Sequence, residues 1–159
     1  MITMIKNIVS FILPITVLII VPLWIEDDWT IHFGLSLICG LLLIVVGLVV
    51  MVLTISSFIR IGKGTLAPWS PTKKLVIKGL YRYVRNPMIL GVLTVLLGEA
   101  LTVRSENMLI WAAAFFIINN IYFIIYEEPN LEQRFGNEYR EYKKHVGRWV
   151  PRSNPYKRD

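Results

Sequence analysis

Long apolar segments alternate with short polar ones along most of the chain. Four segments are apolar over enough residues to cross the hydrocarbon core of a bilayer, which takes about 17–25 mainly apolar residues. These segments are 8–25, 31–59, 88–103 and 108–126, the third being the shortest. Short polar stretches at 26–30 and 104–107 separate the members of each pair and predict tight hairpin connections. The pattern predicts an all-α integral membrane protein with about four transmembrane helices in a single membrane domain, residues 1–159.

The longest polar connection predicted between two of these helices is residues 60–87. It contains three prolines and seven Lys or Arg residues, with no acidic residue. Proline and glycine at this density interrupt regular helices. We therefore expect a structured surface loop between the second and third helices.

The C-terminal segment, residues 127–159, changes abruptly in character to polar and charged. Apolar and aromatic side chains nevertheless recur in it at steps of three or four, which places them along one side of a helix. They follow Glu127 and are Leu131, Phe135, Tyr139, Tyr142 and Val146. This pattern predicts one amphipathic helix that lies along the membrane face or packs on the 60–87 loop. A simple interfacial anchor is the plain alternative.

Basic residues are distributed very unevenly about the predicted helices. The chain carries a net charge of +6, and with four crossings 16 of its 17 Lys and Arg residues fall on one side, leaving Arg104 opposite. Because positive charge favours the cytoplasmic side, both termini and the 60–87 loop are expected in the cytoplasm. The first apolar segment is long for a signal peptide and is interpreted as a retained helix. The basic excess thus indicates topology and attraction to anionic lipid, not nucleic acid.

The sequence contains few isolated groups that point to chemistry. Cys39 is the only cysteine, so an intrachain disulfide is excluded, and we predict no metal site because His32 and His145 stand alone. Glu99 is a functional candidate because an ionisable residue within a span is costly. It lies near the outer end of its segment, where it reaches water or pairs with Arg104. A small four-helix transporter using Glu99 is therefore one hypothesis of a different class.

Two cytoplasmic segments are predicted to come together at the ends of the last two helices. If residues 88–126 form a hairpin, Asn86-Pro87 and Glu127-Glu128 emerge side by side. Two carboxylates beside aromatic rings suit a cationic ligand through charge and cation–π attraction. The plain alternative is that both carboxylates pair with Arg82 or Arg85.

These two segments carry a family resemblance. The sequence "KKLVIKGLYRYVRNPMILG" and, about 40 residues later, "EEPNLEQRFGNEYREYKKHVGRWVP" resemble the isoprenylcysteine carboxyl methyltransferase family and its bacterial members, and more distantly the phospholipid methyltransferases. The resemblance covers about residues 73–151. The family pattern is Arg-His-Pro-x-Tyr-x-Gly, then a Glu pair, a Leu, Phe-Gly and two tyrosines. The matching residues are Arg85, Pro87, Gly91, Glu127, Glu128, Leu131, Phe135, Gly136, Tyr139 and Tyr142.

The resemblance implies an S-adenosylmethionine-dependent methyltransferase of the bacterial inner membrane. In the family, the cofactor lies in a cytoplasmic pocket over the last two membrane helices and the C-terminal segment closes it. The acceptor is a small lipophilic molecule or lipid that enters from the bilayer. The cofactor contacts implied here by position are Lys73, Leu75, Val76, Tyr81, Asn86, Pro87, Met88, Ile89, Glu127 and Glu128. Arg85 and Glu128 are the candidates for a catalytic role.

The chain departs from the family pattern at three positions. Asn86 replaces the His, and it still donates and accepts hydrogen bonds. Ile89 replaces the Tyr and has no phenol to bond the cofactor. Phe123 stands where eukaryotic members carry an arginine that serves the substrate. A prenylcysteine carboxylate is therefore poorly supported as the substrate, and phospholipid amino-group methylation and a binding protein without turnover stay open. No general base is identified.

Overall fold

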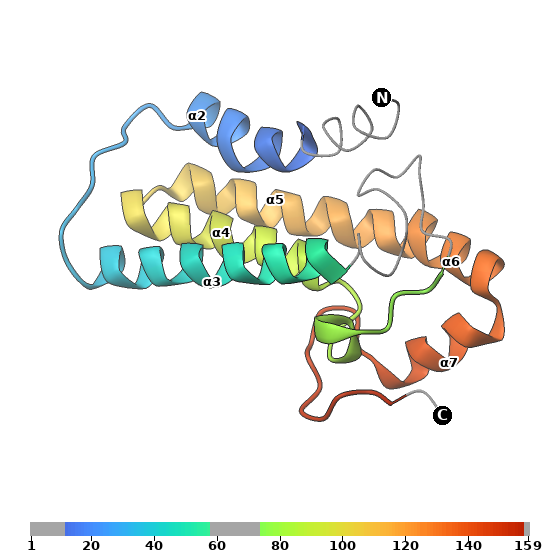
Figure 1. Cartoon of the computed structure of the whole chain (residues 1–159). Helices are drawn as coiled ribbons and strands as arrows, with labels where there is room; N and C mark the ends of the chain where they lie inside the picture. Colours follow the sequence, from blue (N-terminus) through green and yellow to red (C-terminus); the bar gives the residue numbers. More distant parts are fainter. Residues whose placement is uncertain (1–11, 58–73, 158–159) are drawn as a thin grey trace, which may run out of the picture.

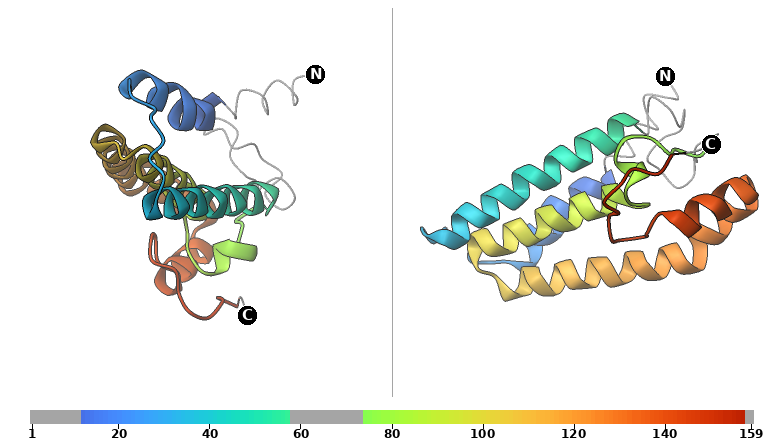
Figure 2. Two further views of the ribbon diagram at one scale, coloured as in Figure 1. Left: turned by 90° about the vertical axis from the view of Figure 1, so that its left-hand side faces the viewer. Right: turned by 90° about the horizontal axis from the view of Figure 1, so that it is seen from below.

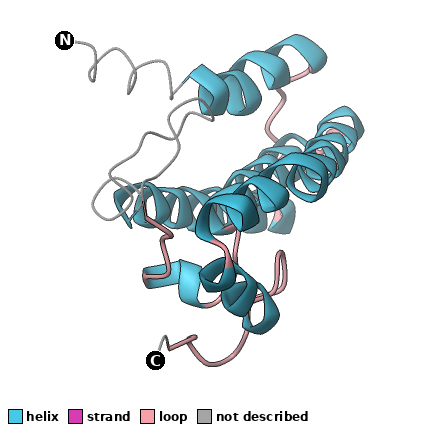
Figure 3. Cartoon of the chain, turned by 90° about the vertical axis from the view of Figure 1, so that its right-hand side faces the viewer, coloured by secondary structure: helices cyan, strands magenta, loops and turns pink. Residues whose placement is uncertain are grey.

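The described part of the chain is built of helices and connecting loops. The computed structural model describes residues 12–57 and 74–157, and within these ranges it contains no strand (Figures 1 and 3). The predicted all-α fold class is confirmed. Lys73 lies outside the described residues, as do the first residues of the segment 8–25 and the last residues of the segment 31–59.

Helical stretches follow one another along the described chain, and each of its two π-helical turns lies inside a longer continuous helix. A first helix, Ile12–Ile25, includes the π-helical turn Thr16–Ile20 and α2, Val21–Ile25. It is followed by α3 (Leu35–Ser57), the 3-10 turn Gly79–Arg82, α4 (Pro87–Val103), α5 (Glu106–Tyr122), the π-helical turn Phe123–Glu127, α6 (Glu128–Phe135) and α7 (Asn137–His145).

The two short connections differ from each other. Residues 26–34 form a longer loop than the expected hairpin, and α3 begins four residues later than predicted. The reason is local. The Asp28 carboxylate accepts hydrogen bonds from the backbone amide and the hydroxyl of Thr30, and such side-chain bonds compete with the backbone bonds of a helix. The connection from α4 to α5 is tight, as expected. There Ser105 caps α5 by accepting a hydrogen bond from the Met108 amide at 3.1 Å.

Within residues 12–57 and 74–157, two continuous helices are long and apolar enough to cross a membrane. They are Leu35–Ser57 and the 30-residue helix Glu106–Phe135, which combines α5 with the turn that follows it and α6. Only 22% and 17% of their most apolar stretches is buried inside the molecule, whereas the core helix of a soluble protein is mostly buried. Ile12–Ile25 and Pro87–Val103 are apolar but shorter, so four crossings remain a prediction.

Helices α3 and α4 lie side by side (Figure 2). They approach each other closely through glycines that are spaced seven residues apart on both helices. Gly40 faces Gly98, and Gly47 faces Gly91. A Cβ added at Gly40 or Gly47 would lie 2.7 Å from the facing carbonyl oxygen. Small residues at such contacts allow membrane helices to pack backbone against backbone. The glycine pairs therefore fix the position of α4 against α3, and with it the position of the turn that precedes Pro87, the first residue of α4.

A buried apolar cluster joins these helices to α5 and the first helix. Its members are Met51, Val92, Val95, Leu96, Ala112 and Phe115. The Trp111 indole donates a hydrogen bond to the Val17 carbonyl at 3.1 Å, which connects α5 to the first helix. Ile89, which stands where the family has a tyrosine, packs against this cluster.

The C-terminal segment is not the single helix that its periodicity predicts. It breaks between α6 and α7 at Gly136, whose φ of 53° and ψ of −127° suit glycine but not other residues. The predicted stripe is still buried on one side, in a cluster of Tyr139, Tyr142 and Val146 with Leu131 and Phe135. Leu75, Ile77 and Tyr156 pack against the same cluster. The segment thus packs on the loop that precedes α4, which is the second of the two expected arrangements.

Candidate functional site

The turn that leads into α4 is held in place by the C-terminal segment. The Arg85 amide donates to the Gly147 carbonyl at 2.9 Å, the Arg152 amide to Tyr83 at 3.0 Å, and the Tyr156 amide to Arg82 at 2.9 Å. These backbone bonds join residues 82–85 to residues 147–156. The C-terminal segment therefore covers the basic aromatic turn.

Glu128 is the centre of a buried charge cluster beside that turn. Its side chain is 5% exposed and pairs with Arg85 at 3.0 Å and with Lys143 at 3.2 Å. Arg148 donates a third charged bond from Nε. Buried carboxylates require this kind of compensation, since an unpaired charge is costly away from water. Of the two expected arrangements, the plain one holds for Glu128, which pairs with Arg85.

Arg148 was not predicted from the sequence as a site residue. Its guanidinium also donates to the Asn120 amide oxygen at 3.3 Å, and the Trp149 indole donates to the same oxygen at 2.8 Å. Asn120 therefore anchors the C-terminal segment to the end of α5. Two features of the sequence could have indicated this contact: Asn120 is a polar residue within an apolar segment, and Arg148 stands next to Trp149 in the C-terminal segment.

Glu127 faces a different environment from its neighbour because the helix is locally wound as a π-helix. In this turn the Glu128 amide donates to the Phe123 carbonyl, five residues back. Residues five apart then share a face, and the Tyr122 hydroxyl donates to the Glu127 carboxylate at 3.3 Å. Single π-helical turns inside α-helices are frequent at functional sites. The turn thus points two adjacent carboxylates to separate surroundings.

Aromatic rings gather on the Glu127 side of this turn. Tyr122 lies 5.4 Å from Tyr126, measured between ring centroids, and 5.8 Å from Phe123. Phe123 in turn meets the edge of Trp149 at 5.7 Å. Phe123 therefore fills, by ring packing, the position where eukaryotic family members have an arginine. A half-buried carboxylate beside several rings is suited to a cation.

The buried tyrosines of α7 support the charge cluster from the other side. Arg85 Nη1 donates to the Tyr139 hydroxyl at 3.2 Å, and the Tyr142 hydroxyl donates to the Tyr81 carbonyl at 2.6 Å. Burial, together with the nearby carboxylate, raises the pKa of the Tyr139 phenol to about 12. Tyr139 is therefore a neutral hydrogen-bonding partner at physiological pH.

The remaining predicted cofactor contacts lie along the covered turn and the start of α4. Val76 is buried, and Leu75 packs on the α7 aromatic cluster. Pro87 is fully buried as the first residue of α4, whereas Asn86 and Met88 beside it are half-buried. Arg85 Nε is buried without a hydrogen-bond partner. The structure thus brings Arg85 to Glu128, and it turns Ile89 toward the helix core.

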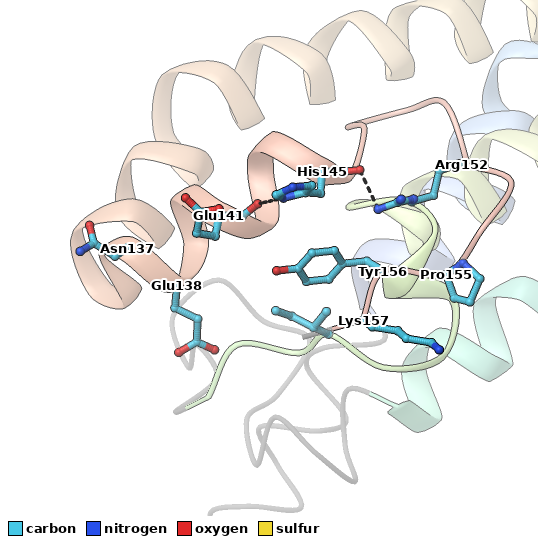
Figure 4. A pocket seen from close by; sticks show the side chains of 9 residues that line it. Asn137, Glu138, Glu141, His145, Arg152, Pro155, Tyr156 and Lys157 are labelled. Atoms are coloured by element: carbon cyan, nitrogen blue, oxygen red, sulfur yellow. Dashed lines mark hydrogen bonds between the residues drawn. The ribbon is translucent and has the colours of Figure 1, made fainter. Parts of the chain in front are cut away.

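Two cavities lie in the C-terminal region. One of about 670 Å³ is lined by side chains of α7 and the last described residues, including His145, which stacks on Tyr156 (Figure 4). None of the predicted cofactor contacts lines it. The other, of about 320 Å³, is lined by Ile124, Glu128, Pro129, Glu132, Gln133, Arg140 and Lys143. The smaller cavity therefore borders the Glu128 cluster.

Glu99 lies far along α4 from this region, toward the α4–α5 connection. One of its carboxylate oxygens is buried without a hydrogen-bond partner. Pairing with Arg104 was one of the two arrangements expected for Glu99, the other being contact with water. The Arg104 Nε donates to the Ser36 hydroxyl at 3.0 Å. Among the described ranges 12–57 and 74–157, no group of three or more His, Cys, Asp or Glu residues is placed to hold a metal ion.

Comparison with known proteins agrees with the sequence resemblance. Residues 35–138 match the phospholipid methyltransferase family. A protein of Haemophilus influenzae described as "Uncharacterized protein" is 42% identical over 65 residues, which is 40% of this chain and all of that protein. No solved structure matches the chain. Since the family match covers well over half of the chain, this protein belongs to the phospholipid methyltransferase family of membrane methyltransferases.

Proposed function

We propose that the protein is an S-adenosylmethionine-dependent methyltransferase that methylates a lipophilic acceptor dissolved in the membrane. The observation that carries the proposal is the separation of Glu127 from Glu128. Glu128 is neutralised by Arg85, Arg148 and Lys143. Glu127 lies beside Tyr122 and the other rings of the π-helical turn, a setting that suits a cation.

S-adenosylmethionine is a cation because its transferable methyl group is bonded to a positively charged sulfur. The residues beside Glu127 fit such a group, since one carboxylate and several aromatic faces are available at the end of an apolar helix. We propose that Asn86, Met88 and Tyr81 form the opposite wall of the pocket, with Leu75, Val76 and Pro87 behind them. Lys73 belongs to the same proposal by position in the family pattern.

The chain's own residues then act mainly by positioning. Methyl transfer needs an in-line approach of the acceptor, so holding both reactants in place supplies much of the acceleration. Arg85 and Glu128 fix the turn before α4 against α6 and α7, and are positioning residues in this proposal. The C-terminal segment is held by Asn120 and by the 82–85 turn, and we propose that it covers the bound reactants and excludes water.

Family membership favours a phospholipid amino group as the acceptor. Phe123 supports this choice, because it packs on Trp149 at the position of the arginine that serves a carboxylate substrate in eukaryotic relatives. A small lipophilic acceptor of the isoprenylcysteine type is the second candidate. In either case we propose an inner-membrane protein with both termini in the cytoplasm. The methyltransferase family gives no support to a transporter using Glu99.

The test is methyl transfer in membranes that contain the overproduced protein. Membranes are incubated with S-adenosylmethionine carrying a deuterated methyl group, and extracted lipids are analysed by mass spectrometry. We expect labelled mono- or dimethylated phosphatidylethanolamine, and its loss in a Glu127→Gln variant of normal abundance. Label in a non-phospholipid product would select the second acceptor class. Absence of label from the whole lipid extract would overturn the proposal.

A further inference from the structure

The cations around Glu128 exceed the carboxylates that they contact. Arg85, Arg148 and Lys143 converge on Glu128, and Arg140 and Lys143 contact Glu132 at 2.8 and 3.8 Å. Four cations thus meet two carboxylates in one connected cluster. A group of like charges held this closely is stabilised by an additional anion.

The 320 Å³ cavity opens where Arg140 and Lys143 of this cluster reach the surface, and the carboxylates with which they pair, Glu128 and Glu132, line it as well. Lys143 and Arg140 both line it, and their side chains are 40% and 59% exposed. Exposed ion pairs of the kind that Arg140 and Lys143 make with Glu132 are individually weak. An incoming anion therefore competes with Glu132 for the two cations at little cost.

The position of the cavity identifies the source of the anion. Ile124, which lines one side, is 48% exposed and belongs to the π-helical turn Phe123–Glu127, which follows α5 within the continuous helix Glu106–Phe135. Pro129 and Gln133 line the cavity next to it, one and two turns further along the same helix. The cavity thus joins the end of a membrane-spanning helix to two cations. A phospholipid is complementary to this arrangement, because its apolar chains lie next to a negatively charged phosphate at the boundary of the apolar layer.

We propose that the α6–α7 groove, defined by Ile124, Glu132, Arg140 and Lys143, binds the phosphate group of a membrane phospholipid. This inference rests on the proposed function and deepens it, because a lipid held there by its phosphate has its headgroup next to the Glu127–Glu128 turn. Glu132 lines the same groove and attracts an ammonium group. The groove thus suits a zwitterionic headgroup, with the phosphate on Arg140 and Lys143.

The test is equilibrium binding of a short-chain, water-soluble phosphatidylethanolamine to the full-length protein in detergent. We expect saturable binding, weakened about tenfold or more in Arg140→Gln/Lys143→Gln, the scale of losing charge-assisted hydrogen bonds. Lys144→Gln/Lys157→Gln removes the same charge outside the groove and should bind as the wild type. Because Lys143 also contacts Glu128, Arg140→Gln alone provides a variant that leaves the Glu128 cluster intact.

Three results would overturn the proposal. One is unchanged lipid binding in both groove variants. Another is equal binding of inorganic phosphate at the same concentration, which would mean a free anion and not a lipid. The third is loss of S-adenosylmethionine binding in Arg140→Gln, measured by calorimetry, which would assign the cations to the cofactor. Retained cofactor binding with weakened lipid binding supports the groove, whereas absent cofactor binding in the wild type would instead reject the proposed function.

Discussion

Replacing Glu128 by glutamine tests the charge cluster that holds the candidate site together. The amide keeps the shape of the side chain but removes the charge, and its NH₂ group turns a donor toward the Arg85 and Arg148 donors. Arg85, only 10% exposed, is then left as a poorly compensated buried cation. Removing one partner of a buried pair costs about 3–5 kcal/mol.

The lower end of that range applies here, because Lys143 and Arg148 are 40% and 23% exposed and water replaces part of the lost interaction. At roughly 2–4 °C per kcal/mol for a chain of this size, the thermal midpoint should fall by about 6–12 °C. The assay is thermal unfolding in detergent, followed by tryptophan fluorescence, to which Trp149 contributes directly.

Glu132→Gln is the matched control for this variant. It removes the same charge from the neighbouring turn of α6, but its partners Arg140 and Lys143 are more exposed. Surface ion pairs contribute about 0–1 kcal/mol, so the control should lose at most a few degrees. If both variants unfold within about 2 °C of each other, Glu128 is not the structural centre of the site and the reasoning fails.

Three further predictions concern the packing and ionisation of single residues. In Gly98→Leu the new side chain meets the Gly40 carbonyl oxygen, from which even a Cβ would be only 2.6 Å away, so overpacking should lower the free energy of unfolding by about 1–3 kcal/mol or more. The measurement is urea unfolding in detergent, and Ala113→Leu on the exposed face of α5 is the control. Gly136→Ala should lose about 1–3 kcal/mol by the same assay from backbone strain alone, because nothing lies within 4 Å of the added Cβ; an unchanged stability would contradict the observed φ. Tyr139→Phe should remove one tyrosinate signal near pH 12 from the ultraviolet titration of the folded protein, because burial raises the pKa of this phenol to about 12. Since an unfolded tyrosine ionises near pH 10, the wild type should lose stability relative to this variant as the pH rises above 10, and a difference signal centred at 10 would contradict the burial.

The apolar pattern predicted the helices because lipid-facing helices need apolar side chains over a fixed length. It did not predict where the helices touch, since Gly40, Gly47, Gly91 and Gly98 carry no hydrophobic signal. Their seven-residue spacing on both α3 and α4 is visible in the sequence, but only the structure shows that the two sets face each other.

The C-terminal segment also shows what the spacing of apolar residues can and cannot predict. Steps of three and four residues through Tyr139 and Tyr142 identified the buried side correctly, yet the helix breaks at Gly136, where one glycine with a positive φ changes its direction. One of the two alternatives drawn from the sequence paired the carboxylates with Arg82 or Arg85, and the structure pairs Glu128 with Arg85. The sequence did not reveal Arg148, because that contact depends on the fold of the last residues over Asn120.

Binding of S-adenosylmethionine is the most direct test of the central proposal. The measurement is titration calorimetry on the purified full-length protein, in detergent and again in lipid nanodiscs, with Glu127→Gln and Glu132→Gln as variants. The account predicts saturable binding to the wild type and to Glu132→Gln, and loss of binding in Glu127→Gln with thermal stability unchanged. Folded wild-type protein that binds no S-adenosylmethionine in either environment would contradict it.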